Sequence, residues 1–184
     1  PSGADVTIHN MKIYSSVKIV VEKGGKLTLD DSVAYGAVEV NGGTLSARNS
    51  SSFVNQITLN DGSTLEDAEI RSHANYLTDG NYKVEAPKAP VQTNGTVTVK
   101  GACSIEGEGI VANKDAQSGL IVNAGKLVIE QGATLKSTGG SVDVNGGNGG
   151  AGVILNGGSI VGNGCLEAVG GSVGMGGGDG GAGI

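Results

Sequence analysis

The side chains best suited to catalysis in this sequence are a few clustered carboxylates. Glu66, Asp67 and Glu69 lie close together, and Asp30 is followed directly by Asp31. Polysaccharide hydrolases use two carboxylates that converge on one substrate bond. Side chains alternate between the faces of a β-strand, so Asp67 and Glu69 would share a face from which Glu66 points away. Asp30 and Asp31 would point apart by the same rule, and we interpret all five carboxylates as solvated edges rather than as a hydrolase site.

The basic residues and the histidines do not complete a catalytic set. A polysaccharide lyase needs an Arg or Lys base beside acidic metal ligands. Arg71, Lys83 and Lys88 flank the acidic cluster with no spacing that ties them together. His9 and His73 are isolated in the sequence. We interpret both histidines as surface residues.

The cysteines and glycine runs do not indicate a metal or a cofactor either. Cys103 and Cys165 are the only cysteines, and we predict two free, buried thiols that act as small apolar residues. The run 174–181 lacks the repeated pattern of calcium-binding β-rolls. No Gly-Lys-Ser/Thr follows a glycine spacer, as it would in a phosphate-binding loop. We therefore predict no metal ligands and no cofactor.

The aromatic residues suggest carbohydrate binding. The chain has four Tyr, one Phe and no Trp, and no aromatic ring follows Tyr82. Binding sites for small ligands are commonly lined by apolar and aromatic side chains. The candidate ligand contacts are Tyr35, Phe53, Tyr76 and Tyr82, with Tyr35 and Phe53 18 residues apart. A role in capping or in chain corners is the alternative for these rings.

The elements that must position these residues are short strands that repeat along the first half of the chain. Val21, Val40, Leu59 and Leu77 recur at spacings of 19, 19 and 18 residues, and each precedes a turn such as Asn41-Gly42-Gly43. Alternating apolar residues predict strands. The Asn-Gly and Asp-Gly pairs are expected to supply the positive backbone angle φ that tight turns require. Stacking such strands at about 4.8 Å would bury their apolar residues in one narrow core.

This repetition predicts an all-β fold, a parallel β-helix (β-solenoid) with coils of about 18–23 residues. We expect one β-solenoid over residues 1–184, with regular coils over 1–84. Residues 85–95 contain two of the three prolines and are expected to form a loop or junction. Residues 96–184 are expected to form glycine-rich coils. A β-sandwich or barrel also uses short strands, but neither requires one corner to recur at a nearly constant spacing.

The glycine-rich second half is expected to be ordered in tightly turning coils. Val99, Val122 and Val144 suggest coils of about 22–23 residues there. Gly149 and Gly180 each begin a Gly-Gly-Ala-Gly unit, which indicates a longer repeat of about 31 residues near the end. Glycine makes up 35 of the 184 residues, which opposes helices.

The overall charge and hydropathy exclude two classes of partner. The formal net charge of −6 and the scattered basic residues argue against nucleic-acid binding. No apolar run approaches the roughly 20 residues of a membrane span, so no membrane insertion is expected. The chain begins at Pro1 and ends in glycine-rich sequence, so we expect it to be part of a longer protein.

Two repeat units resemble those of bacterial surface proteins. Val40-Asn-Gly-Gly-Thr-Leu45 and its variants resemble the Gly-Gly-Thr-rich repeats of self-associating autotransporter passenger domains. The Gly-Gly-Ala-Gly-Ile unit resembles glycine-rich arrays in secreted or wall-attached surface proteins of gut bacteria. The resemblance implies an extracellular, surface-displayed β-helix with a role in adhesion or aggregation. The corners carry less Thr and Ser than the autotransporter repeats, so heptosylation does not follow from it.

The functional expectation is therefore a non-enzymatic bacterial cell-surface or secreted β-helix segment. It would act in adhesion, in self-association or as a structural stalk. The expected partners are host or bacterial surface glycans or another copy of the chain. Two alternatives remain open: a carbohydrate-binding module, and a β-helix of the polysaccharide lyase or hydrolase type.

Overall fold

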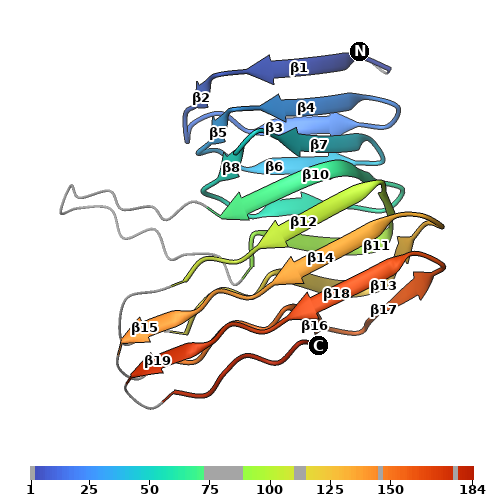
Figure 1. Cartoon of the computed structure of the whole chain (residues 1–184). Coiled ribbons are helices and arrows are strands. Elements are labelled where there is room, and N and C mark those ends of the chain that lie inside the picture. Colours follow the sequence, from blue (N-terminus) through green and yellow to red (C-terminus); the bar gives the residue numbers. More distant parts are fainter. Residues whose placement is uncertain (1–2, 73–88, 110–114, 145–146, 176–177) are drawn as a thin grey trace.

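The chain is all-β, as expected from its sequence. The computed structural model describes residues 3–72, 89–109, 115–144, 147–175 and 178–184, and every regular element in them is a strand (Figure 1). The strands of the first half are β1 (Asp5–His9), β2 (Lys12–Ile13), β3 (Ile19–Glu22), β4 (Lys26–Asp30), β5 (Val33–Ala34), β6 (Val38–Asn41), β7 (Thr44–Arg48), β8 (Ser52–Phe53), β9 (Ile57–Leu59) and β10 (Thr64–Ser72). Those of the second half are β11 (Val91–Lys100), β12 (Ala102–Glu106), β13 (Leu120–Ile129), β14 (Thr134–Thr138), β15 (Val142–Val144), β16 (Val153–Leu155), β17 (Gly158–Gly162), β18 (Cys165–Val169) and β19 (Val173–Met175).

The strands pair in parallel and curl around the molecule (Figure 1). We call the stretch of chain between two directly paired residues of neighbouring strands a circuit. The predicted recurrence is confirmed for Val21, Val40 and Leu59, which are direct partners in β3, β6 and β9. Leu77 lies outside the described residues. The expected junction over 85–95 overlaps β11, which already begins at Val91.

The circuits of the second half are longer than the sequence suggested. Val122 pairs with Thr93 and with Leu155, and the asparagines that follow these residues are offset by 29 and 33 positions. Val99 pairs with Ile129 rather than with Val122, so the shorter spacing expected from the valines is wrong. That expectation linked valines that are not partners: Val99 and Val122 lie at different positions along the paired strands β11 and β13. The longer repeat seen near the end does correspond to a circuit, because β15 pairs with β19.

The core is a narrow stack of aliphatic side chains, with each circuit adding one residue to a column. One column runs through Leu27, Leu45, Leu65, Val99 and Ile129, each at most 4% exposed. Burying a side chain of this size stabilises the fold by about 1.5–3 kcal/mol. Because the partners in a column are similar in size, each circuit packs directly on the next.

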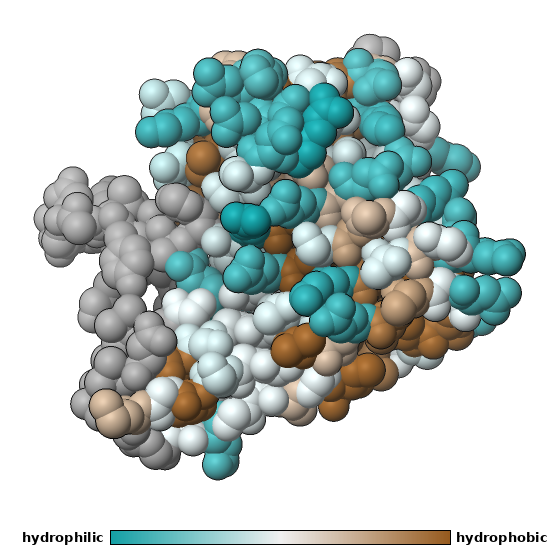
Figure 2. Space-filling model, in the orientation of Figure 1, coloured by the Kyte–Doolittle hydropathy of each residue, from teal (hydrophilic) through white to brown (hydrophobic). Residues whose placement is uncertain are grey.

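The surface is unevenly polar along the stack. On the face shown in Figure 2, hydrophilic side chains cover most of the N-terminal strands, whereas apolar ones gather towards the C-terminal strands. Val161 of β17 and Val169 of β18 are 42% and 38% exposed. The polarity of the outward face of the sheet therefore changes along the stack.

In the recurring corner, the glycine and the asparagine have different roles. Positive φ is taken by the glycines of the corner, as at Gly42 (76°) and Gly95 (83°), whereas Asn41 and Asn94 do not have positive φ. The asparagines instead form a ladder, in which each Nδ2 donates to the Oδ1 of the preceding circuit. The amide ladder consists of Asn41, Asn60, Asn94, Asn123 and Asn156, with N–O distances of 2.7, 3.2, 3.0 and 3.2 Å. The predicted corner is therefore confirmed, with positive φ at its glycine, and the amide ladder is an additional role of its asparagines that the sequence did not reveal.

The C-terminal glycines form extended arms rather than tight turns. Residues 139–144 run outward and 147–152 return beside them, and 170–175 and 178–183 repeat this one circuit later (Figure 1). The two sides bond directly through backbone groups: Gly150 N donates to Gly140 O at 2.9 Å, and Gly171 N donates to Gly150 O at 2.8 Å. We call these four segments the glycine double layer. At its closest approaches it leaves no room for a side chain, because a Cβ at Gly150 would lie 1.8 Å from Gln117 O.

This close approach predicts that Gly150→Ala is strongly destabilising. We expect a loss of about 3 kcal/mol or more in the free energy of unfolding, since backbone atoms would have to move. Gly180→Ala is the matched control, because its Cβ would meet nothing closer than Gly171 O at 3.7 Å. The control should change stability by no more than about 0.5 kcal/mol. Urea unfolding of both variants measures this, and equal effects would contradict the close backbone approach at Gly150.

Candidate functional site

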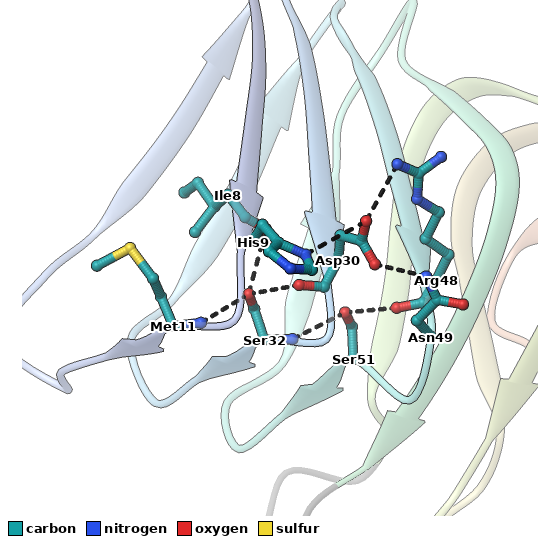
Figure 3. A network of polar contacts seen from close by, with 8 residues as sticks. All are labelled: Ile8, His9, Met11, Asp30, Ser32, Arg48, Asn49 and Ser51. Atoms are coloured by element: carbon teal, nitrogen blue, oxygen red, sulfur yellow. Dashed lines mark hydrogen bonds and ion pairs between the residues drawn. The ribbon is translucent and has the colours of Figure 1, made fainter.

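The most connected polar site is centred on Asp30, at the end of β4 (Figure 3). Asp30 Oδ2 lies 3.1 Å from Arg48 Nη2, and Asp30 Oδ1 accepts a hydrogen bond of 2.6 Å from Asn49 Nδ2. His9 Nδ1 lies 3.5 Å from Asp30 Oδ2. His9, Asp30 and Arg48 are direct partners in β1, β4 and β7, so parallel pairing places them in one column.

The charges of this column stabilise one another. The hydrogen bond from Asn49 and the guanidinium of Arg48 hold the pKa of the Asp30 carboxyl below its ordinary value. The His9 side chain is 68% exposed. A carboxylate beside an imidazole can orient a general base. Such a base also needs a nucleophile and a bound substrate within reach.

The nearby serines do not supply that nucleophile. Ser32 Oγ is buried, lies 2.9 Å from the backbone O of Asp30, and accepts a hydrogen bond from Met11 N. Ser51 Oγ donates to Arg48 O at 2.8 Å and accepts from Ser32 N (Figure 3). Both hydroxyls satisfy backbone groups inside the corner. The Asp30 site therefore links three circuits through side-chain contacts.

A second polar site is a groove on the outward face of β10, β12 and β14. We call it the charged groove; it is lined by Glu69, Arg71, Ser104, Ile105, Glu106, Lys136 and Thr138. Glu69 pairs with Arg71 at 2.5 Å, and Lys136 pairs with Glu167 of β18 at 2.9 Å. These four side chains are 38–54% exposed. The charged groove therefore lacks the closed, water-excluding character that favours acid–base catalysis.

The acidic cluster is arranged differently from the expectation. Asp67 has a φ of 44°, and the register of β10 with β7 shifts between Leu65 and Ala68. This bulge adds a residue, so Glu66 and Glu69 both lie on the outward side and the predicted division of faces is wrong. Glu66 binds Lys26 Nζ at 2.5 Å, which raises the pKa of Lys26.

Two of the four predicted aromatic contacts, Tyr35 and Phe53, lie among the described residues, and neither ring is fully exposed. Phe53 is 1% exposed and pairs with Ala34, so its ring belongs to the core and is not available to a ligand. Tyr35 is half-buried. Tyr76 and Tyr82 lie outside the described residues, as do His73, Lys83 and Lys88. Among the described residues, Phe53 is the one aromatic ring in the aliphatic core, which the sequence pattern did not reveal.

The two free cysteines differ in their exposure to solvent. Cys103 is free and buried as predicted, and burial raises the pKa of its thiol to about 11. Cys165 is free but exposed, so the prediction is wrong there. It begins β18 at a position whose partner, Thr134, is also exposed, which shows that this column faces outward.

A third site, which sequence reasoning missed, lies along β11, β13 and β16. We call it the amide–aliphatic groove; it is lined by Gln56, Gln92, Ile121, Asn123, Ile154, Leu155 and Asn156, with a volume of about 500 Å³. One side of it is the amide ladder. A sequence signal for this groove does exist. An asparagine recurs before each corner glycine, and the residue two positions before it, such as Ile121 before Asn123, faces outward.

Comparison of the chain with protein families, with curated proteins and with solved structures found no match in any of the three. Among the described residues, no three His, Cys, Asp or Glu side chains are grouped so that they could hold a metal ion. The same residues contain no helix long and apolar enough to cross a membrane. The function must therefore be argued from the geometry of the three sites.

The Asp30 site predicts a specific dependence of stability on pH. The pKa of Asp30 is lowered in the folded chain. The ionised carboxylate therefore contributes fully to the stability of the fold at pH values above the ordinary pKa of 3.8. This contribution is lost as the pH falls from that value through the lowered pKa. Urea unfolding over this range should show that Asp30→Asn destabilises the chain at neutral pH and that the difference from wild type shrinks in acid.

The adjacent Asp31 provides the control for this measurement. Asp31 is exposed, and the contacts of the Asp30 site are made by the Asp30 carboxylate with His9, Arg48 and Asn49. Asp31→Asn should therefore leave the pH profile of stability unchanged. If the effect of Asp30→Asn were the same at every pH, its carboxylate would not be stabilised by Arg48 and Asn49.

Proposed function

We propose that the chain is a β-solenoid segment that acts as a non-enzymatic scaffold or stalk in a surface-displayed or secreted bacterial protein. The observation that carries this proposal is the continuous parallel pairing of circuits from β1 to β18. Paired circuits of this kind are the building units of solenoids, whose stability comes from contacts between neighbours. Such a stack resists extension because every circuit is bonded to the next.

Side-chain ladders add to this resistance. The amide ladder links five circuits on one face, and His9, Asp30 and Arg48 link three on another. Lys26 and Glu66 connect strands that are two circuits apart. These contacts join side chains of successive circuits to one another. They favour a role in which the stack has to keep its shape.

The surface location rests on the resemblance to surface-protein repeats. In that setting, the outward-facing columns would be available to surface glycans or to a second copy of the chain. The enzymatic alternatives have less support, because the Asp30 site is committed to structural bonds and the charged groove is open to solvent. A scaffold that also adheres is therefore the better account.

Mechanical unfolding of single molecules tests this function. Pulled between its two ends, the chain should unfold cooperatively, and Asn94→Ala should lower the force required. The variant leaves Asn60 Oδ1 without a donor and Asn123 Nδ2 without its acceptor in the ladder. We expect it also to lower the free energy of unfolding by about 1–2 kcal/mol.

Lys126→Ala is the control, because Lys126 is exposed on β13 beside the ladder corner. It should not change the unfolding force. The proposal fails if the wild-type chain extends without resistance, or if it cleaves an acidic polysaccharide such as polygalacturonate. Equal forces for Asn94→Ala and wild type would remove the ladder from the account.

A further inference from the structure

We propose that the amide–aliphatic groove binds a neutral glycan. The groove runs across three consecutive strands, β11, β13 and β16, and begins beside Gln56 before β9. Its volume of about 500 Å³ is within the range of roughly 300–1,000 Å³ for small-ligand sites. This inference names a ligand class for the proposed scaffold and rests on that proposal.

The floor of the groove is aliphatic. Ile121 and Ile154 are direct partners in β13 and β16, and both point outward from the sheet. Ile154 is 37% exposed, whereas the core residues of these strands, Leu120 and Val153, are 1% exposed. A pyranose ring presents C–H groups on one face, and a flat aliphatic pair can pack against that face.

The walls of the groove are amides held in fixed orientations. Gln92 Nε2 donates to Thr58 Oγ1 at 3.0 Å, and Asn123 Nδ2 donates to Asn94 Oδ1 at 3.0 Å and to Gln92 Oε1 at 3.5 Å. Asn156 Nδ2 donates to Asn123 Oδ1 at 3.2 Å. Because these side chains are already ordered, a ligand that binds them loses little conformational entropy.

The amides keep some hydrogen-bonding capacity for a ligand. An amide side chain has two N–H donors and two acceptor lone pairs. The ladder uses one donor of Asn156, and the bond to Thr58 uses one donor of Gln92. The remaining donors and lone pairs suit hydroxyl groups, which both donate and accept. An amide wall above an aliphatic floor therefore matches the hydroxyl rim and the C–H face of a sugar.

The absence of charge selects a neutral ligand. None of the seven residues that line the amide–aliphatic groove is ionisable. The charged groove, in contrast, has two carboxylates and two cationic side chains among its lining residues. An acidic polysaccharide would leave its carboxylates without a cationic partner in the amide–aliphatic groove. The two grooves thus differ in the charge of the ligand that they could accept.

Titration calorimetry with defined hexasaccharides tests the inference. The neutral probes are cellohexaose, xylohexaose and mannohexaose, and the acidic probe is hexagalacturonate. We expect at least one neutral hexasaccharide to bind with a dissociation constant of about 1 mM or tighter. Ile154→Ser and Gln92→Ala should each weaken that binding by about fivefold to tenfold, because each removes one kind of contact.

Lys136→Ala in the charged groove is the control and should leave the neutral binding unchanged. Ile154 is partly exposed, so Ile154→Ser should keep the wild-type unfolding midpoint and separate lost binding from lost folding. The inference is overturned if no neutral hexasaccharide binds, if hexagalacturonate binds in preference, or if Ile154→Ser binds like wild type. The pulling experiment involves no ligand, so failure of the glycan site leaves the test of the scaffold intact.

Discussion

The structure depends on one constraint, the parallel hydrogen bonding of each circuit to the next. Parallel pairing fixes the distance between neighbouring strands at about 4.8 Å. Every side chain then lies directly against its counterpart in the next circuit. Inside, this requires partners of similar size, such as Leu27, Leu45 and Leu65. The core is narrow because each circuit adds only one residue to each column.

The same constraint explains the surface and the glycine content. Outside the core, identical side chains in register can bond along the stack, as the amide ladder does. Where two sides of one circuit approach each other without a core between them, only glycine fits, as at Gly150 and Gly171. The glycines of the arms are thus a packing requirement, whereas those of the corners supply positive φ.

The sequence was sufficient to predict the strands and the register of the first half, but not the longer circuits. Val21, Val40 and Leu59 recur because they are partners in one column, so their spacing measures the circuit directly. Val99 and Val122 are both buried but belong to different columns, and alternation alone cannot distinguish columns. The bulge at Asp67 was equally hidden, since one inserted residue reverses every face that follows.

The candidate sites were harder to predict than the fold, because they depend on neighbours a circuit away. Phe53 was predicted to contact a ligand but is buried in the core. Gln92 and Asn123 were not predicted as ligand contacts but line a groove. Which side chains share a groove follows from circuit length, and the spacing of the valines indicated the wrong length for that half. The resemblance to surface repeats indicated a class of protein but no binding residue.

The most direct test of the stacked arrangement is a distance between spin labels on Asp5→Cys and Val161→Cys in a Cys165→Ser background. These two positions lie at the ends of one outward column that runs through Lys26, Thr44, Thr64, Thr98 and Val128. Six strand spacings separate them, so the account predicts one narrow distribution centred near about 29 Å. A broad distribution, or a single distance far from this value, would contradict the in-register stack.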